Sequence, residues 1–178
     1  MSVKSFKTSG VGVDLAPQGL VLINTTSFSG VTSISLPAAT FSATYDNYKL
    51  YFSGVIATGA SAVLGRLRVG GADNSTANSY VRQVVVADDT SLTSARQTTT
   101  NWDLGGWNTT LVNALEVDLI NPFSATPTGM LYRTLRSSSS AYFHTGCGTH
   151  NQSVSYDAFT LSCANNMTGS VSVYGYNK

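Results

Sequence analysis

The sequence predicts an all-β protein, an antiparallel β-sandwich of the jelly-roll kind preceded by an extended N-terminal arm. Ser and Thr make up about a quarter of the 178 residues, and Val, Thr, Tyr and Phe outnumber the residues that favour exposed helices. Short segments alternate between apolar and polar residues and are separated by Gly, Asn and Asp. No segment has the apolar spacing of an amphipathic helix. Many short strands with regular turn signals are typical of a sandwich or barrel.

Charge is scarce along the whole chain. Charged residues account for 11% of it, against about 25% in an average domain. The net charge is +1, whereas a nucleic-acid-binding surface needs a basic stripe, so nucleic acid is not an expected partner. Neutral hydroxyl and amide groups supply most of the polarity, which suits contact with other proteins or with sugars.

The first 19 residues are poor in apolar side chains and contain three glycines and a proline, which predicts an extended arm. Residues 20–178 are then expected to form a single sandwich domain. Lys4 and Lys7 are the cations of the arm, and no apolar run follows them, so the segment does not resemble a signal peptide. No stretch reaches 18 apolar residues, which argues against a membrane span. We therefore expect synthesis and folding in a cytoplasm, unless a dedicated machine exports the protein.

The first predicted strands lie in "GLVLINTTSFSGVTSISLP". Residues 21–23 and 31–36 are apolar or alternating, and Ser29-Gly30 between them indicates a turn. In "YDNYKLYFSG" the Asp-Asn pair starts a turn, and the following residues alternate with period two. This alternation predicts a half-buried strand whose outward side chains are Lys49 and Tyr51. Its predicted core residues are Tyr48, Leu50 and Phe52.

The next two predicted strands lie in "VLGRLRVGGADNS" and "SYVRQVVVADD", each ended by turn residues. Residues 87–109 lack clean periodicity, which predicts a long loop or a loop with one short strand; such loops are usually functional. The remaining segments alternate in step and bring the count to about ten strands, with an Asn165-Asn166 turn near the end. They cover residues 111–119, 130–136, the segment after the serine run 137–140, 159–163 and 171–173.

No catalytic or metal-binding motif is present in the sequence. Asp88 and Asp89 are adjacent, so on a strand they point in opposite directions and suit a turn better than acid–base catalysis. His144, Cys147 and His150 do not match a common zinc spacing, and the cysteine has the opposite parity. We expect no enzyme activity, no metal and no cofactor. Two cysteines, Cys147 and Cys163, are either free thiols or a single bridge.

Two groups of residues are candidates for contacts with a partner. Trp102 and Trp107 lie in the predicted loop, where they would either plug the end of the sandwich or present rings to a protein or a sugar. Arg66 and Arg68 share one face of a predicted strand, which is either a solvated face or an inter-subunit contact. With Lys4 and Lys7 of the arm, these residues form the predicted partner-binding set.

Three spaced motifs resemble segments of virion proteins of tailed bacteriophages. The first is "FSATYDNYKLYFSG", the second is the arginine-containing strand and Gly-Gly turn of "LGRLRVGGADN", and the third is "TGSVSVYGY" near the C-terminus. They appear in the expected order between about residue 24 and residue 178, with a weaker match over about 87–130. The motifs resemble ones that maintain a fold, so no functional residue is carried over from the resemblance.

The resemblance implies a structural β-sandwich on the surface of a phage particle. The leading hypothesis is a capsid decoration (cement) protein that binds the major capsid protein or other virion proteins and forms a symmetric homotrimer. The alternative is a tail-fibre or baseplate module that binds a host glycan through the Trp102–Trp107 loop. An enzyme acting on surface polysaccharide is the third possibility, and it lacks a plausible acid pair.

Overall fold

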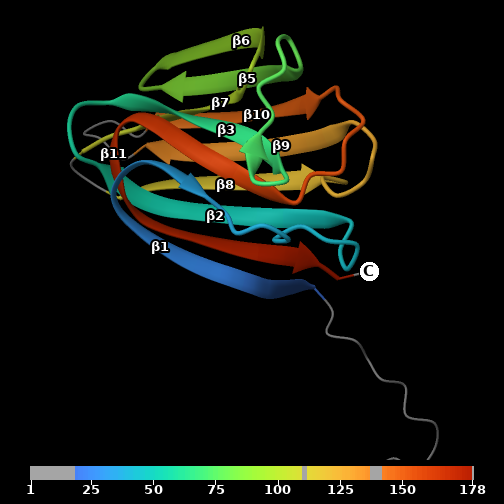
Figure 1. The fold of residues 1–178 in the computed structure, drawn as a ribbon. Helices are drawn as coiled ribbons and strands as arrows, with labels where there is room; N and C mark the ends of the chain where they lie inside the picture. The colour runs from blue at the N-terminus through green and yellow to red at the C-terminus, as the bar shows by residue number, and fades with distance from the viewer. Residues whose placement is uncertain (1–18, 110–111, 137–141, 178) are drawn as a thin grey trace, which may run out of the picture.

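The structure, a computed structural model, describes residues 19–109, 112–136 and 142–177. Within these ranges the chain is all-β, every strand pairing is antiparallel, and no helix occurs (Figure 1). The predicted all-β antiparallel sandwich is confirmed, and the curled sheet is compatible with a jelly-roll-like fold. The strands are β1 (Leu20–Ser35), β2 (Asn47–Ile56), β3 (Ser61–Val69), β4 (Ala72–Asp73), β5 (Tyr80–Asp88), β6 (Ser91–Thr99), β7 (Trp102–Trp107), β8 (Asn113–Ile120), β9 (Thr128–Arg136), β10 (Tyr142–His150) and β11 (Ala158–Tyr176).

The strands form two layers that share one bent pair, β1 and β11 (Figure 1). In the large layer, residues 167–175 of β11 pair with β2, and the sheet continues through β8, β9, β10 and β5 to β6. In the small layer, residues 158–163 of β11 pair with β3, which also pairs with β7 and β4. β1 follows β11 through both layers, from Leu20 opposite Tyr176 to Ser35 opposite Thr160.

The prediction of two short strands at each end of the chain is wrong, because β1 and β11 are single long strands of 16 and 19 residues. Ser29-Gly30 does not make a hairpin turn. The register of β1 shifts there, between Phe28 and Val31, and Gly30 has a φ of 64°. Asn166 likewise lies within β11, where its carbonyl accepts a hydrogen bond from Ala57 N. These turn signals mark the bends at which the pair passes from one layer to the other.

The prediction of a loop over residues 87–109 is also wrong, because the segment forms the end of β5 and the strands β6 and β7. β6 shows no apolar alternation because it is exposed on both faces. β7 loses its alternation at Gly105, which has a φ of 96° and lies beside a register shift in the pairing with β3. As a result, the consecutive residues Leu104 and Gly105 are both buried. Asp89, with a φ of 53°, lies in the turn between β5 and β6, as the adjacent aspartates predict.

The core lies between the layers and consists mainly of aromatic and aliphatic side chains. Tyr48, Leu50 and Phe52 are buried and Tyr51 is exposed, which confirms the alternation predicted for β2. Phe52 of the large layer lies 6.2 Å, between ring centroids, from Phe159 of the small layer. Full burial of such a side chain stabilises the fold by roughly 2–3 kcal/mol.

Two of the three motifs singled out in the sequence meet in space and have structural roles. The Tyr48 hydroxyl donates to the Ser42 carbonyl at 2.8 Å and accepts from the Ser42 N–H at 2.7 Å, which holds the chain that enters β2. Gly175, in the C-terminal motif, lies so close to the Tyr45 ring that an added Cβ would be 2.4 Å from it. These contacts hold the first and last parts of the domain together.

A pair of glycines allows close approach of β2 and β11. Gly54 lies opposite Gly169, and a Cβ on Gly54 would come within 2.5 Å of the Thr168 carbonyl oxygen and 3.2 Å of the Trp107 ring. Neither backbone nor a buried tryptophan can move far in a close-packed interior. The two glycines thus let Trp107 pack directly against the β2–β11 pair.

We predict that Gly54→Ala destabilises the protein by about 1–3 kcal/mol, because the new methyl group overpacks this contact. Urea unfolding of the purified protein measures the change. Gly106→Ala is the matched control, since its Cβ would find no atom closer than 3.6 Å. Equal stabilities for the two variants would contradict this account of the glycine pair.

His150, at the end of β10, is fully buried among aromatic rings. Its Nε2 lies 2.6 Å from the Tyr156 hydroxyl, and its ring centroid is 4.1 Å from that of Tyr80. Burial lowers the pKa of His150 to about 4, well below its ordinary value of 6.5. The folded state therefore holds the neutral ring through a pH range in which the unfolded chain takes up a proton.

Acidification should consequently weaken the fold between pH 6.5 and pH 4. In that range the unfolded state binds more protons at His150 than the folded state does. Lowering the pH from 6.5 to 4 therefore reduces the free energy of unfolding by about 3 kcal/mol from this group alone. Unfolding free energies measured at pH 7, 5.5 and 4 should fall less steeply for His150→Gln, whose amide does not titrate. Parallel pH dependences for the two proteins would contradict the prediction.

Candidate functional site: the outer face of the large layer

The two tryptophans of the predicted partner-binding set are fully buried. Trp102 packs edge-on against Tyr80, with ring centroids 4.9 Å apart, and its Nε1 donates to the Val81 carbonyl at 3.2 Å. Trp107 lies against Gly54. The expectation that these rings face a protein or a sugar is wrong, because β7 places them between the layers. Their alternative role in filling the sandwich is confirmed.

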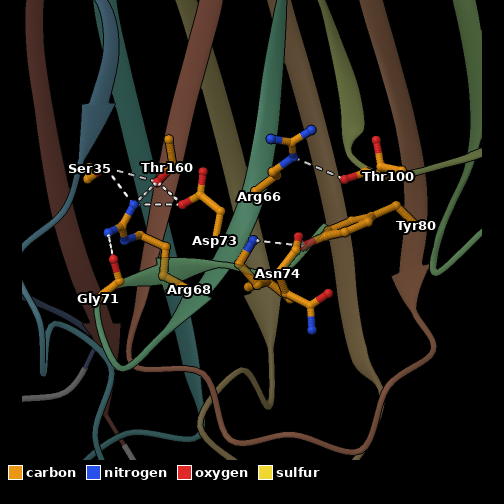
Figure 2. A network of polar contacts seen from close by, with 10 residues as sticks. Ser35, Arg66, Arg68, Gly71, Asp73, Asn74, Tyr80, Thr100 and Thr160 are labelled. Atoms are coloured by element: carbon orange, nitrogen blue, oxygen red, sulfur yellow. Dashed lines mark hydrogen bonds and ion pairs between the residues drawn. The ribbon is translucent and has the colours of Figure 1, made fainter. Parts of the chain in front are cut away.

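Arg68 fastens the β3–β4 turn to two other strands (Figure 2). Its Nη1 lies 2.6 Å from Asp73 Oδ1 and donates at 2.8 Å to both Thr160 Oγ1 on β11 and Ser35 Oγ on β1. Its Nη2 donates to the Gly71 carbonyl. These donors are used within the chain, so Arg68 holds the bent β1–β11 pair against β3.

Arg66 lies on the same side of β3, as its parity predicts, and makes a different contact. Its Nε donates to the Thr100 carbonyl at 3.1 Å, which ties β3 to the link between β6 and β7 (Figure 2). Nearby, the Tyr80 hydroxyl accepts from Leu67 N and donates to the Asn74 carbonyl, at 3.1 and 2.8 Å. Lys4 and Lys7, the other predicted contact residues, lie outside the described residues.

The polar residues considered for chemistry are not gathered into a site. His144 and His150 are buried, whereas Cys147 between them is exposed on the opposite side of β10, as its parity predicts. Both cysteines are free thiols. Over the described ranges, no three His, Cys, Asp or Glu side chains come together in a way that could hold a metal ion. Nor do these ranges contain a helix that is long and apolar enough to cross a membrane.

Sequence reasoning missed one surface, the side of the large layer that faces away from the small layer. We call it the outer face. It is formed by the outward side chains of β2, β8, β9, β10 and β5, and its strands are in register across five neighbours. Large apolar side chains on it are 40–51% exposed. They are Tyr51, Val85, Ile120, Leu131, Leu135 and Phe143.

The charges of the outer face neutralise one another. Arg133 Nη2 lies 2.6 Å from Glu116 Oε2, and Lys49 Nζ lies 3.5 Å from that oxygen and 3.2 Å from Asp118 Oδ1. Partial burial alone would raise the pKa of Glu116, but the hydrogen bond from Arg133 and the charges of Lys49 and Arg133 lower it below its ordinary value. The carboxylate therefore stays ionised and paired at neutral pH.

Shallow hollows flank this ion-pair cluster. One is lined by Tyr51, Ala114, Leu135 and Phe143 together with Glu116 and Arg133. Such a hollow is open and lacks a nucleophile–base pair, so it offers shape and apolar contact rather than acid–base chemistry. A sheet face that carries several exposed large apolar groups around a neutralised polar centre is typical of a protein-binding surface. Alternation alone could have predicted the outward positions, but only the strand order brings them together.

Comparison with known proteins returns no match for this chain: no protein-family model, no curated protein and no solved structure is similar to it at a significant level.

We predict that Arg68→Ala destabilises the fold by about 2 kcal/mol, because it leaves Asp73 and Thr160 without their charged donor. Arg66→Ala, which removes a partly buried hydrogen bond to the Thr100 carbonyl, should cost about 1 kcal/mol or less. Chemical denaturation of both variants measures the difference. A loss for Arg66→Ala as large as that for Arg68→Ala would show that the network in Figure 2 is not the main fastening of this region.

Proposed function

We propose that the chain is a structural protein of a tailed-phage virion, a decoration protein that binds the outer shell and stabilises it. The observation that carries the proposal is the outer face, a broad sheet surface with exposed apolar groups and internally paired charges. The resemblance of three motifs to virion proteins gives the class of particle. Its partner would be the major capsid protein or another virion protein, and its location the virion surface.

The physical properties of the outer face suit a repeated contact with a shell. Its charges are already compensated within the chain, so covering them costs less desolvation than covering unpaired ions. Burial of the apolar side chains contributes favourably to the binding free energy, at roughly 25 cal/mol per Å² of apolar surface removed from water. A β-sheet supports them rigidly, so little conformational entropy is lost on binding. Many copies on one particle then stabilise it by mass action.

Particles that lack the protein provide the direct test. Purified chain should co-sediment with such particles, and the decorated particles should withstand higher temperature and lower salt before they release DNA. Undecorated particles that remain equally stable, or particles that do not bind the chain, would refute the function.

A substitution on the outer face should separate binding from folding. Phe143→Lys places a charge in the apolar hollow and should weaken shell binding at least about tenfold, since a buried unpaired charge is costly. Val69→Lys is the matched control, because Val69 is equally exposed, at 41%, but lies on β3 of the small layer. Co-sedimentation titrations compare the two variants. Binding that is lost with Val69→Lys and kept with Phe143→Lys would show that the other layer faces the shell.

The predicted homotrimer stays a prediction, and so does the contact of the Lys4–Lys7 arm with a shell. The glycan-binding alternative was based on an exposed Trp102–Trp107 loop. These rings are buried in β7, so they are not available to bind a glycan.

A further inference from the structure

β6 is an edge strand that extends beyond the sandwich. All its residues from Ser91 to Thr98 are exposed, so neither of its faces packs against the core. Among the described residues it pairs only with β5, from Tyr80 opposite Thr99 to Asp88 opposite Ser91. Figure 1 shows β6 as the outermost strand at the top of the sheet. Its other edge therefore presents a row of backbone N–H and C=O groups.

The other edge strands of this sheet carry features that hinder the addition of a further strand. β4 is two residues long. β1 has three register shifts along its pairing with β11, and β7 lies beside a register shift in its pairing with β3. Short strands and bulges are the usual means by which proteins protect sheet edges.

β6 has none of these protections. Its nine residues pair with β5 in an uninterrupted register, and its sequence, SLTSARQTT, contains no proline and one charged residue, Arg96. Leu92 is 73% exposed, the largest exposed fraction among the large apolar side chains of the described residues. An edge of this kind is favourable for strand addition, in which main-chain hydrogen bonds supply the affinity.

We infer that β6 pairs with β6 of a second copy of this chain, antiparallel and across a two-fold axis. A strand that pairs with itself places residue i opposite residue j and residue j opposite residue i, as a closed two-fold contact requires. Overlap of all nine residues fixes the register, because Ser91 must then lie opposite Thr99 of the second copy. The axis passes beside Ala95, which lies opposite its own copy.

The side chains of β6 are compatible with this register. Arg96 lies opposite Ser94 of the second copy, so the two arginines do not face each other, and Leu92 lies opposite Thr98. Ala95 faces the inner side, because its partner on β5 is the buried Val84. A small residue at the axis leaves room for the two copies to approach. The pairing also joins the two outer faces into one continuous sheet surface.

This inference is independent of the proposed virion function, since it depends on the edge alone. It also differs from the homotrimer expected from the resemblance, because a two-fold contact gives a dimer or an even-numbered assembly. The subunit count therefore decides between them.

Paired charge substitutions at Ala95 test the contact. Wild-type protein should have twice the 18.7 kDa chain mass in sedimentation equilibrium or light scattering. Ala95→Lys and Ala95→Glu each place like charges opposite one another, so each alone should raise the dimer dissociation constant about tenfold or more. An equimolar mixture of the two variants should recover the dimer, because opposite charges then meet at the axis.

Val85→Lys is the control, since it adds the same charge on β5, one strand away from the edge. It should leave the dimer intact, and circular dichroism should show the same strand content for all variants. A monomeric wild-type protein would overturn the inference, and so would a trimer. An oligomer that is unchanged by both Ala95 variants, or a mixture that does not recover dimer, would also overturn it.

Discussion

The fold depends on one constraint, the antiparallel pairing of β1 with β11 through both layers. β11 pairs with β2 in the large layer and with β3 in the small layer, and β1 follows it through both, so one strand pair joins the two layers on one side. In the small layer, Arg68 links Ser35 on β1 and Thr160 on β11 to the β3–β4 turn. In the large layer, Gly54 and Gly169 let Trp107 pack against the β2–β11 pair. Because this pair of β1 and β11 joins the two layers, the core lies between them and the outer face lies on the far side of the large layer.

The fold class was predictable because the composition and the period-two alternation are local properties. Tyr48, Leu50 and Phe52 are a clear example, since each is buried as its spacing indicates. The bends in β1 and β11 were not predictable, because a glycine at a bulge and a glycine in a turn leave the same local signal. β6 was missed because both of its faces are exposed, which removes the alternation that identifies a half-buried strand.

The candidate site was predictable only in part. Lys49 and Tyr51 were expected to face outward, and they do, but the sequence could not show that Glu116, Arg133 and Phe143 lie beside them. That neighbourhood depends on the strand order β2-β8-β9-β10, which is set by long-range pairing. Trp102 and Trp107 were expected in a loop, because the residues around them lack periodicity. They lie in a buried strand, β7, whose alternation is interrupted at Gly105. A surface without a catalytic motif also leaves few signals in one sequence, because outward apolar residues are common on any sheet.

The outer face and the β6 edge are two surfaces that suit contacts with different physical bases. The outer face offers apolar side chains around a neutralised ion-pair cluster, which suits packing against a foreign surface. The edge offers main-chain hydrogen bonds, which suit a copy of the same strand. Since the two are contiguous through β5, pairing at the edge would double the area that one assembly presents to a shell without altering either surface.

The most direct test of the proposed virion function is an electron cryo-microscopy reconstruction of tailed-phage particles that lack the protein, with and without the purified chain. The account predicts added density on the shell in the presence of the chain, with strands β2, β8, β9, β10 and β5 turned toward the capsid. Shells that show no added density, or density in which this layer faces solvent and the small layer contacts the capsid, would contradict it.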